Sequence, residues 1–241
     1  VPFLMITHGR PQWEQNVPAS PSHVAPTAAK PDEHVYDEQR WLVWSQLALG
    51  SKGVSYFCYW TPAGFNGGPF SWTTDGQKTR MYDILKNINQ EIQPIGSILM
   101  KCHADGAMMT NPNGRFVMYL NDGMGLSNYG PVLELSRGND EDVVAGCFRD
   151  ASTGEYKVLV THKSPATSDK EAATASIANM KIDTRMAITV KLHTVTLNEH
   201  NAAATTIVSE QSVINGELSL SIPDGTAVLV EFPSTANVKY N

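Results

Sequence analysis

The sequence predicts an α/β segment over residues 1–104, followed by an antiparallel β-sandwich over residues 105–241. Two observations predict this division. Apolar residues recur at helical or fully buried spacing before residue 105 and alternate with polar residues after it. The first segment also reads strand, helix, strand, helix, and parallel strands joined in this way are buried on both faces. Since two such units cannot cover both faces of a sheet alone, we expect them to belong to a larger parallel sheet or barrel.

Four elements are expected in the first segment: strand Pro2–Ile6, helix Tyr36–Leu49, strand Gly53–Trp60 and helix Thr79–Ile92. Gly50 stands directly after the first helix, where a left-handed cap is favoured. On the second helix, apolar residues at helical spacing fall on one face: Met81, Leu85, Ile88 and Ile92. This stripe is typical of a helix with one buried face.

The second segment is expected to contain short strands joined by tight turns. Apolar and polar residues alternate over 156–161, 186–192 and 218–222, which predicts half-buried strands. Turn residues at 150–154 and 223–225 predict two hairpins. These hairpins would join Val143–Arg149 to Glu155–Thr161 and Gly216–Ile222 to Thr226–Phe232. Regular turns between short strands are typical of a β-sandwich.

Composition excludes several classes of protein. The apolar content of 41% and the charged content of 17% are those of a globular chain. A net charge of -6 argues against a nucleic-acid surface, and no apolar run approaches the ~18 residues of a membrane span. The widely spaced Cys58, Cys102 and Cys147 are expected to be buried apolar residues rather than disulfide or zinc ligands. The histidines show no metal-ligand spacing, so neither a metal nor a cofactor is expected.

Two long connections follow the predicted parallel strands. Residues 7–35 and 61–78 separate each strand from its helix, whereas ordinary βα connections take ~2–6 residues. Prolines in the first connection disfavour a hidden helix. Both connections leave the C-terminal ends of strands, which is the face on which α/β barrels build their active sites.

Aromatic residues in these connections would suit a sugar-binding mouth, because a flat ring can cover the apolar C–H face of a sugar. The candidates are Trp13, Trp60, Phe65, Phe70 and Trp72. For each ring the alternative is packing against the rim of the sheet. Trp60, which ends the second strand, is the residue most favoured for binding. His8, at the end of the first strand, is a candidate for a hydrogen bond to the ligand.

A catalytic carboxylate is the other requirement of a glycosidase, because hydrolysis needs one acid and one nucleophile or base. Glu14 is the candidate catalytic residue, since it follows Trp13 just beyond the first strand. The alternative for Glu14 is a solvated loop carboxylate. The sequence contains neither a serine nucleophile elbow nor a glycine-rich phosphate loop.

The run 38–57, together with residues 2–5 and the loop that carries Trp13, resembles the last quarter of clan A glycoside hydrolase barrels. The closest similarity is to the β-galactosidase-like family 42 group and its relatives. Residues 75–79 and 82–89 resemble the eighth helix of the same barrels. This resemblance implies the last two βα units of a (β/α)8 TIM barrel, strands 7–8 and helices 7–8, with an appended β-sandwich. It also implies that Trp60 stacks on the sugar.

The resemblance implies further that the partners are a carbohydrate and the missing N-terminal part of the barrel, from the same parent protein or a companion chain. A secreted or periplasmic location is favoured on the same ground. One departure matters: the nucleophilic Glu of those relatives would fall near Ile6 or Thr7, where no carboxylate stands. The acid/base Glu would lie on a fourth strand outside this segment. We therefore expect this chain alone to be inactive.

Three functions remain open on the sequence. The first is the C-terminal portion of a glycoside hydrolase that acts on O-glycosidic bonds of oligo- or polysaccharides and supplies part of the sugar-binding mouth. The second is a non-catalytic carbohydrate-binding or scaffold protein of glycosidase ancestry, which the missing strand-seven Glu favours. The third is an adhesion-type sandwich with a helical adaptor.

Overall fold

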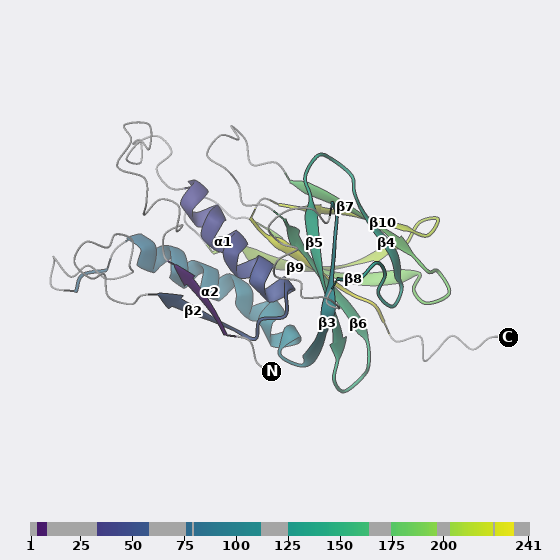
Figure 1. Cartoon of the computed structure of the whole chain (residues 1–241), viewed down its shortest axis with the longest axis horizontal. Coiled ribbons are helices and arrows are strands. Elements are labelled where there is room, and N and C mark those ends of the chain that lie inside the picture. The colour runs from purple at the N-terminus through teal and green to yellow at the C-terminus, as the bar shows by residue number, and fades with distance from the viewer. Residues whose placement is uncertain are drawn as a thin grey trace.

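The structure, a computed structural model, describes residues 4–8, 33–57, 76–78, 80–111, 125–163, 175–196, 203–223 and 225–233. These residues form two helices and eleven strands (Figure 1). In chain order the elements are β1 (Leu4–His8), α1 (Glu33–Ala48), β2 (Gly53–Phe57), α2 (Arg80–Leu99), β3 (Cys102–Met109), β4 (Val132–Arg137), β5 (Val143–Asp150), β6 (Tyr156–His162), β7 (Ser176–Ile182), β8 (Thr189–Thr196), β9 (Thr205–Ser212), β10 (Glu217–Ile222) and β11 (Ala227–Glu231).

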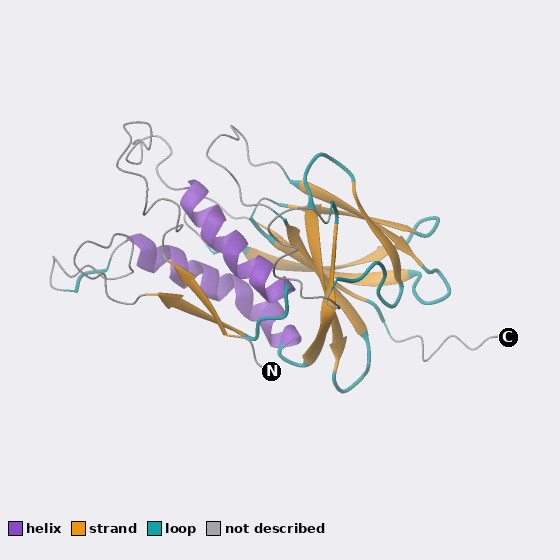
Figure 2. Cartoon of the chain, in the orientation of Figure 1, coloured by secondary structure: helices purple, strands orange, loops and turns teal. Residues whose placement is uncertain are grey.

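Two antiparallel sheets form the β-rich half of the molecule. The larger has the strand order β3-β5-β6-β11-β8-β9, and the smaller has the order β10-β7-β4. Their facing surfaces share one hydrophobic core, and Figure 2 shows them as two layers of orange strands. The core residues of the larger sheet include Ala145, Cys147, Val158, Val160, Val228 and Val230. From the smaller sheet they meet Ala178, Met180, Leu218, Leu220 and Ile222. The two sheets therefore form a β-sandwich.

Both helices cover the opposite face of the six-stranded sheet. Successive residues of a strand point to opposite faces, and on β5 Val144 and Phe148 belong to the helix-side core whereas Ala145 and Cys147 belong to the sandwich core. Trp44 of α1 and Ile88 of α2 are fully buried in the helix-side core. The central strands are thus buried on both faces, which explains why they are apolar without alternation.

A glycine sets the approach of α1 to the sheet. A Cβ built on Gly146 would lie 1.9 Å from the carbonyl oxygen of Ala48, far inside contact distance. Only a residue without a side chain allows the last turn of α1 to lie directly on β5.

The prediction of the last two βα units of a TIM barrel is wrong. Among the named strands of the described ranges, β1 and β2 are the only parallel pair, while the other nine strands form two antiparallel sheets. The helices pack on the antiparallel six-stranded sheet and not around a parallel barrel. The expectation that the two βα units need a further surface is correct. Strands after residue 101 of the same chain supply that surface, because both helices pack on the six-stranded sheet. The boundary expected at 104/105 falls inside β3, which pairs with β5.

Several individual elements are confirmed. The first expected hairpin is present as β5–β6. The second is wrong, because β10 and β11 follow each other in the chain but belong to different sheets. The second helix is longer than expected, because α2 runs on through Pro94 to Leu99. Ile95 and Leu99 are buried in the helix-side core, so packing maintains the helix beyond a proline that disfavours it.

Candidate functional site

The edge at which β1 and β2 end is the place where the sequence predicts a sugar-binding mouth. The two strands are parallel, with Leu4 opposite Gly53 and His8 opposite Phe57. The segments that follow them, 9–32 and 58–75, therefore both leave the sheet at the same edge. This confirms that the two long connections depart from neighbouring strand ends.

Of the predicted site residues, the structure describes only His8. His8 is the last residue of β1, which places its backbone at this edge. The remaining candidates lie outside the described residues: Trp13, Glu14, Trp60, Phe65, Phe70 and Trp72. Their roles stay predictions.

The connection between α1 and β2 fixes the direction of β2. Gly50, at φ +93°, lies in the left-handed region. Its N–H donates to Leu47 O at 3.0 Å, and Ser51 N–H donates to Gln46 O at 3.1 Å. These bonds form the Schellman cap expected of a helix-ending glycine, so the predicted cap is confirmed.

Two polar side chains then attach β2 and its entry to α2. Lys52 Nζ donates to Leu99 O, the last carbonyl of α2, at 2.6 Å and to Cys102 O, at the start of β3, at 2.5 Å. Tyr56 OH donates to Asn89 Oδ1 at 2.9 Å. Burial, with Glu91 as a second cause, raises the pKa of Tyr56. The hydroxyl is therefore a fixed hydrogen-bond donor at neutral pH.

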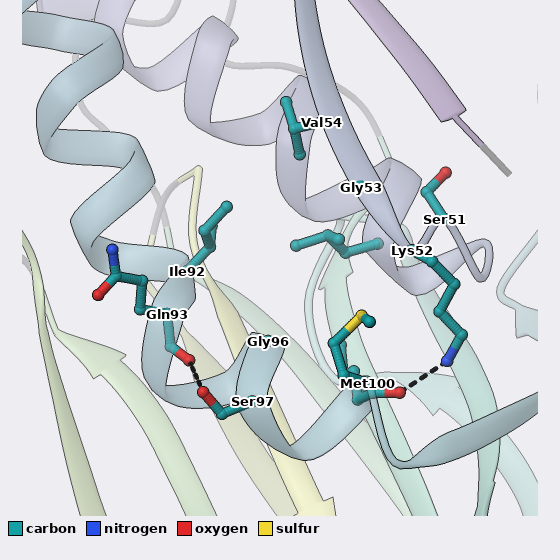
Figure 3. A pocket seen from close by; sticks show the side chains of 11 residues that line it. Ser51, Lys52, Gly53, Val54, Ile92, Gln93, Gly96, Ser97 and Met100 are labelled. Atoms are coloured by element: carbon teal, nitrogen blue, oxygen red, sulfur yellow. Dashed lines mark hydrogen bonds between the residues drawn. The ribbon is translucent and has the colours of Figure 1, made fainter. Parts of the chain in front are cut away.

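A shallow pocket of about 270 Å³ lies between the α1–β2 connection and the last turns of α2 (Figure 3). It opens at the start of β2, the end opposite the His8–Phe57 edge. Its lining includes Val54, Ile92 and Met100. Two of its polar side chains already have partners, because Ser97 Oγ donates to Gln93 O at 2.8 Å and Lys52 Nζ donates to Leu99 O. The pocket therefore offers little polar recognition.

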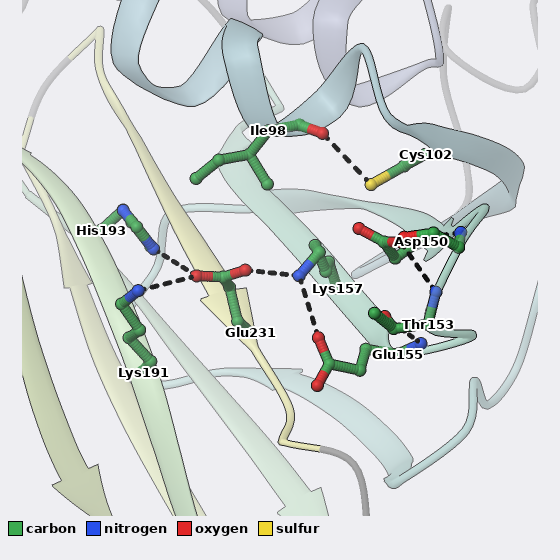
Figure 4. A network of polar contacts seen from close by, with 10 residues as sticks. Ile98, Cys102, Asp150, Thr153, Glu155, Lys157, Lys191, His193 and Glu231 are labelled. Carbon is green, nitrogen blue, oxygen red and sulfur yellow. Dashed lines mark hydrogen bonds and ion pairs between the residues drawn. The ribbon is translucent and has the colours of Figure 1, made fainter.

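A cluster of charged side chains lies on the helix-side face of the six-stranded sheet, beyond the end of α2 (Figure 4). At its centre the Glu231 carboxylate accepts a hydrogen bond from Lys157 Nζ and lies 2.6 Å from His193 Nε2. Lys191 Nζ is 3.5 Å away, and Glu155 adds a second carboxylate 3.7 Å from Lys157. The side chains of Lys157 and His193 are only 3% and 7% exposed. We call these five residues the Glu231 cluster.

Strand pairing builds this cluster. Lys157 on β6 and Lys191 on β8 both stand directly opposite Glu231 on β11. Burial alone would raise the pKa of Glu231, but hydrogen bonds from Lys157 and His193 lower it to about 2. The carboxylate is ionised at neutral pH and fully engaged, so it cannot act as a proton donor there. Sequence reasoning missed this cluster.

A serine and a histidine form a second buried contact, also missed from the sequence. Ser176 Oγ lies 2.7 Å from His162 Nδ1, and His162 Nε2 lies 3.0 Å from Pro223 O. A carbonyl can only accept, so Nε2 carries the proton and Nδ1 accepts from the serine hydroxyl. The pair has the contact of a nucleophile and its base. Yet Ser176 is 0% and His162 3% exposed, so the contact joins β6 to β7 and no substrate can reach the serine.

Comparison with known proteins gives no assignment: no family model, no curated protein and no solved structure matches this chain. In the part of the chain that the structure describes, no group of three or more His, Cys, Asp or Glu side chains is arranged to hold a metal ion. Over the same residues, no helix is long and apolar enough to cross a membrane.

Proposed function

We propose that this chain is the carbohydrate-binding segment of a glycoside hydrolase-like protein, and that it binds sugar at the edge where β1 and β2 end. One observation carries the proposal: the parallel register sets His8 opposite Phe57. The strands that precede the segments 9–32 and 58–75 therefore end side by side. Trp13 is in the first of these segments, and Trp60 stands three residues after Phe57 at the start of the second.

The pocket and the Glu231 cluster, the other two candidate sites in the described residues, are less suited to bind a sugar than this edge. In the pocket between the α1–β2 connection and α2, Lys52 and Ser97 are already hydrogen-bonded within the fold. The Glu231 cluster consists of paired charges packed beneath the end of α2. Neither offers aromatic rings, whereas sugar-binding sites combine an apolar face with a few directed polar groups.

A binding role without hydrolysis is the second candidate, and the placement of the buried carboxylates favours it. Glycoside hydrolysis needs two carboxyl groups flanking the scissile bond. Glu91 is 0% exposed and held in an ion pair by Arg40, and Glu231 is held by Lys157 and His193. These two paired carboxylates maintain the fold. Glu14 is then the carboxylate on which catalysis by this chain would depend.

Sugar binding by the 241-residue chain tests the proposal. Isothermal titration calorimetry with soluble β-galactan, β-glucan and xylan fragments should detect binding to at least one. Trp60→Ala and Trp13→Ala should each weaken that binding at least about tenfold, the equivalent of about 1.4 kcal/mol. Leu133→Ala, which truncates an exposed apolar side chain on β4, is the control and should bind as the wild type does. Absence of binding to all three glycans would contradict the proposal. So would binding by both tryptophan variants with the affinity of the wild type.

Hydrolysis is tested separately with aryl glycosides. Turnover that is lost in Glu14→Gln, with sugar affinity retained, would assign the chain to a hydrolase. Binding without turnover, unchanged by Glu14→Gln, would assign it to the non-catalytic class. Glu210→Gln, on the exposed strand β9, is the matched control.

A further inference from the structure

The pocket at the start of β2 contains a positive charge for which the described residues supply no counter-ion. Lys52 lines this pocket and extends toward Met100 at its rim (Figure 3). Its Nζ donates to Leu99 O and to Cys102 O, and both acceptors are neutral backbone carbonyls. Among the described residues, no Asp or Glu carboxylate forms an ion pair with Lys52. An ammonium group has three N–H donors, so one of them remains for a ligand.

Partial burial makes this uncompensated charge unfavourable. Desolvation lowers the pKa of Lys52, and Cys102 is a smaller cause that opposes the shift. Taking an ammonium group out of water costs free energy unless an opposite charge accompanies it. A carboxylate against Nζ would raise the pKa of Lys52 again, because an opposite charge favours the charged form. The electrostatics of the pocket therefore favour an anion.

A glycine makes the pocket hollow on the side of α2. A Cβ built on Gly96 meets nothing within 4 Å among the described residues, and Gly96 does not have a positive φ. Neither close packing nor backbone conformation therefore requires glycine here, although glycine inside a helix costs about 1 kcal/mol relative to alanine. Ile92 and Met100 also line the pocket, one turn before and one turn after Gly96 on the same helix face. The hollow is thus flanked by apolar side chains.

The size and lining of the pocket limit the class of ligand. Its volume is about 270 Å³, and an apolar cavity of about 150 Å³ is large enough for benzene. Val54, Ile92 and Met100 offer apolar surface to a hydrocarbon chain. The single free N–H of Lys52 suits a carboxylate, whereas a phosphate has three strong acceptor oxygens and would leave most of them unpaired. The hydroxyl groups of a sugar would be unpaired for the same reason.

We propose that this pocket binds a monocarboxylate with a short or medium-length alkyl chain. Its carboxylate accepts a hydrogen bond from Lys52 Nζ, and its chain lies over Gly96 against Val54 and Ile92. Met100 is 63% exposed, and its flexible thioether side chain adjusts to the ligand at the rim. The pocket lies at the end of β2 opposite the edge proposed to bind sugar, so this proposal does not rest on the proposed function.

Isothermal titration calorimetry of the whole chain with octanoate should detect binding with a Kd of about 1 mM or tighter. Octanol and octylammonium keep the chain but remove or reverse the charge, so each should bind at least about tenfold more weakly. Lys52→Met should weaken octanoate binding by a similar factor. Lys101→Met removes a charge at an exposed position outside the pocket and should not. Absence of octanoate binding, or octanol or octylammonium binding with the affinity of octanoate, would overturn the proposal. So would a Lys52→Met variant of unchanged affinity.

Gly96→Leu tests the pocket without disturbing Lys52. Leucine fills the hollow and has the higher helix propensity, so the variant should remain folded by far-UV circular dichroism and lose octanoate affinity at least about tenfold. Gln90→Leu makes a similar change at an exposed position of α2 outside the pocket and should bind octanoate as the wild type does. Unchanged affinity in Gly96→Leu, or equal loss in both variants, would overturn the proposal. Sugar binding should not change in Gly96→Leu, so the failure of either proposal is recognised separately.

Discussion

Arg40 on α1 holds the carboxylate of Glu91 on α2 in a bidentate ion pair, with Nε–Oε2 at 2.7 Å and Nη2–Oε1 at 2.9 Å. The side chains of both residues are almost fully shielded from solvent. Glu91 Oε1 also accepts a hydrogen bond from Ala204 N at 2.9 Å, just before β9. One carboxylate thus connects both helices to the outermost strand of the sheet.

Removing one partner of this ion pair should lower the free energy of unfolding strongly. Glu91→Gln removes the carboxylate that Arg40 holds in the interior, and we expect the free energy of unfolding to fall by about 3–5 kcal/mol in urea denaturation. The double variant Arg40→Met/Glu91→Leu removes both charges and should lose less than the single one. Asp183→Asn, at the ion pair with the exposed Arg185, should cost much less than Glu91→Gln. A single variant as stable as the wild type would contradict the role of this pair.

Substitution of two glycines by alanine should change the stability of the fold in opposite directions. Gly146→Ala forces a Cβ against the Ala48 carbonyl, so stability should fall by about 1–3 kcal/mol or more. Gly96 lies inside α2 with nothing within 4 Å of its Cβ position. Gly96→Ala should therefore raise stability by about 0.5–1 kcal/mol through helix propensity. Thermal unfolding measures both, and changes of the same sign would contradict the described packing of α1 on β5.

The Glu231 cluster should make stability depend on acid pH. The folded pKa of Glu231, about 2, lies below its ordinary value of 4.5. A depressed carboxyl pKa contributes stability above the ordinary value and loses it as pH falls toward the folded one. The stability difference between wild type and Glu231→Gln should therefore shrink between about pH 4.5 and about pH 2. A constant difference for Glu231→Gln would exclude the mechanism.

Lys52 should stabilise the end of α2. Lys52→Met removes the hydrogen bonds to the last carbonyl of α2 and to the first carbonyl of β3, and we expect a loss of about 1.5–3 kcal/mol. Lys101→Met, at an exposed neighbouring position, should be close to neutral. Hydrogen exchange of the last turn of α2 would locate the effect. Faster exchange confined to other elements would show that Lys52 acts elsewhere.

Local pattern predicted most of the individual elements. Alternation located β6 and β10, and turn residues located the ends of β5 and β11. What local pattern could not show was the surface on which the helices pack. A strand–helix–strand–helix run has the same local signature in a barrel and in a layer placed on an antiparallel sheet. The signal that distinguishes them was in the later strands: Val143–Phe148 is apolar without alternation, because both faces of β5 are covered.

The candidate site was predictable only in part. The common edge of β1 and β2 followed from the order of elements, and the register confirms it. The Glu231 cluster was not predictable in the same way. Lys157 stands near the start of β6 and Glu231 ends β11, where charges usually mark strand ends in solvent. Only the three-dimensional pairing of β6, β11 and β8 shows that these charges neutralise each other within the fold.

The buried contact between His162 and Ser176 has a consequence for engineering of the chain. It ties the residue that ends β6 to the residue that begins β7, so both ends of the intervening segment 164–174 are held by the sandwich itself. The free-energy cost of lengthening such a segment is mainly loop-closure entropy, about 0.6 kcal/mol for each doubling. The segment between β6 and β7 is therefore a suitable place to insert a peptide tag or a reporter domain.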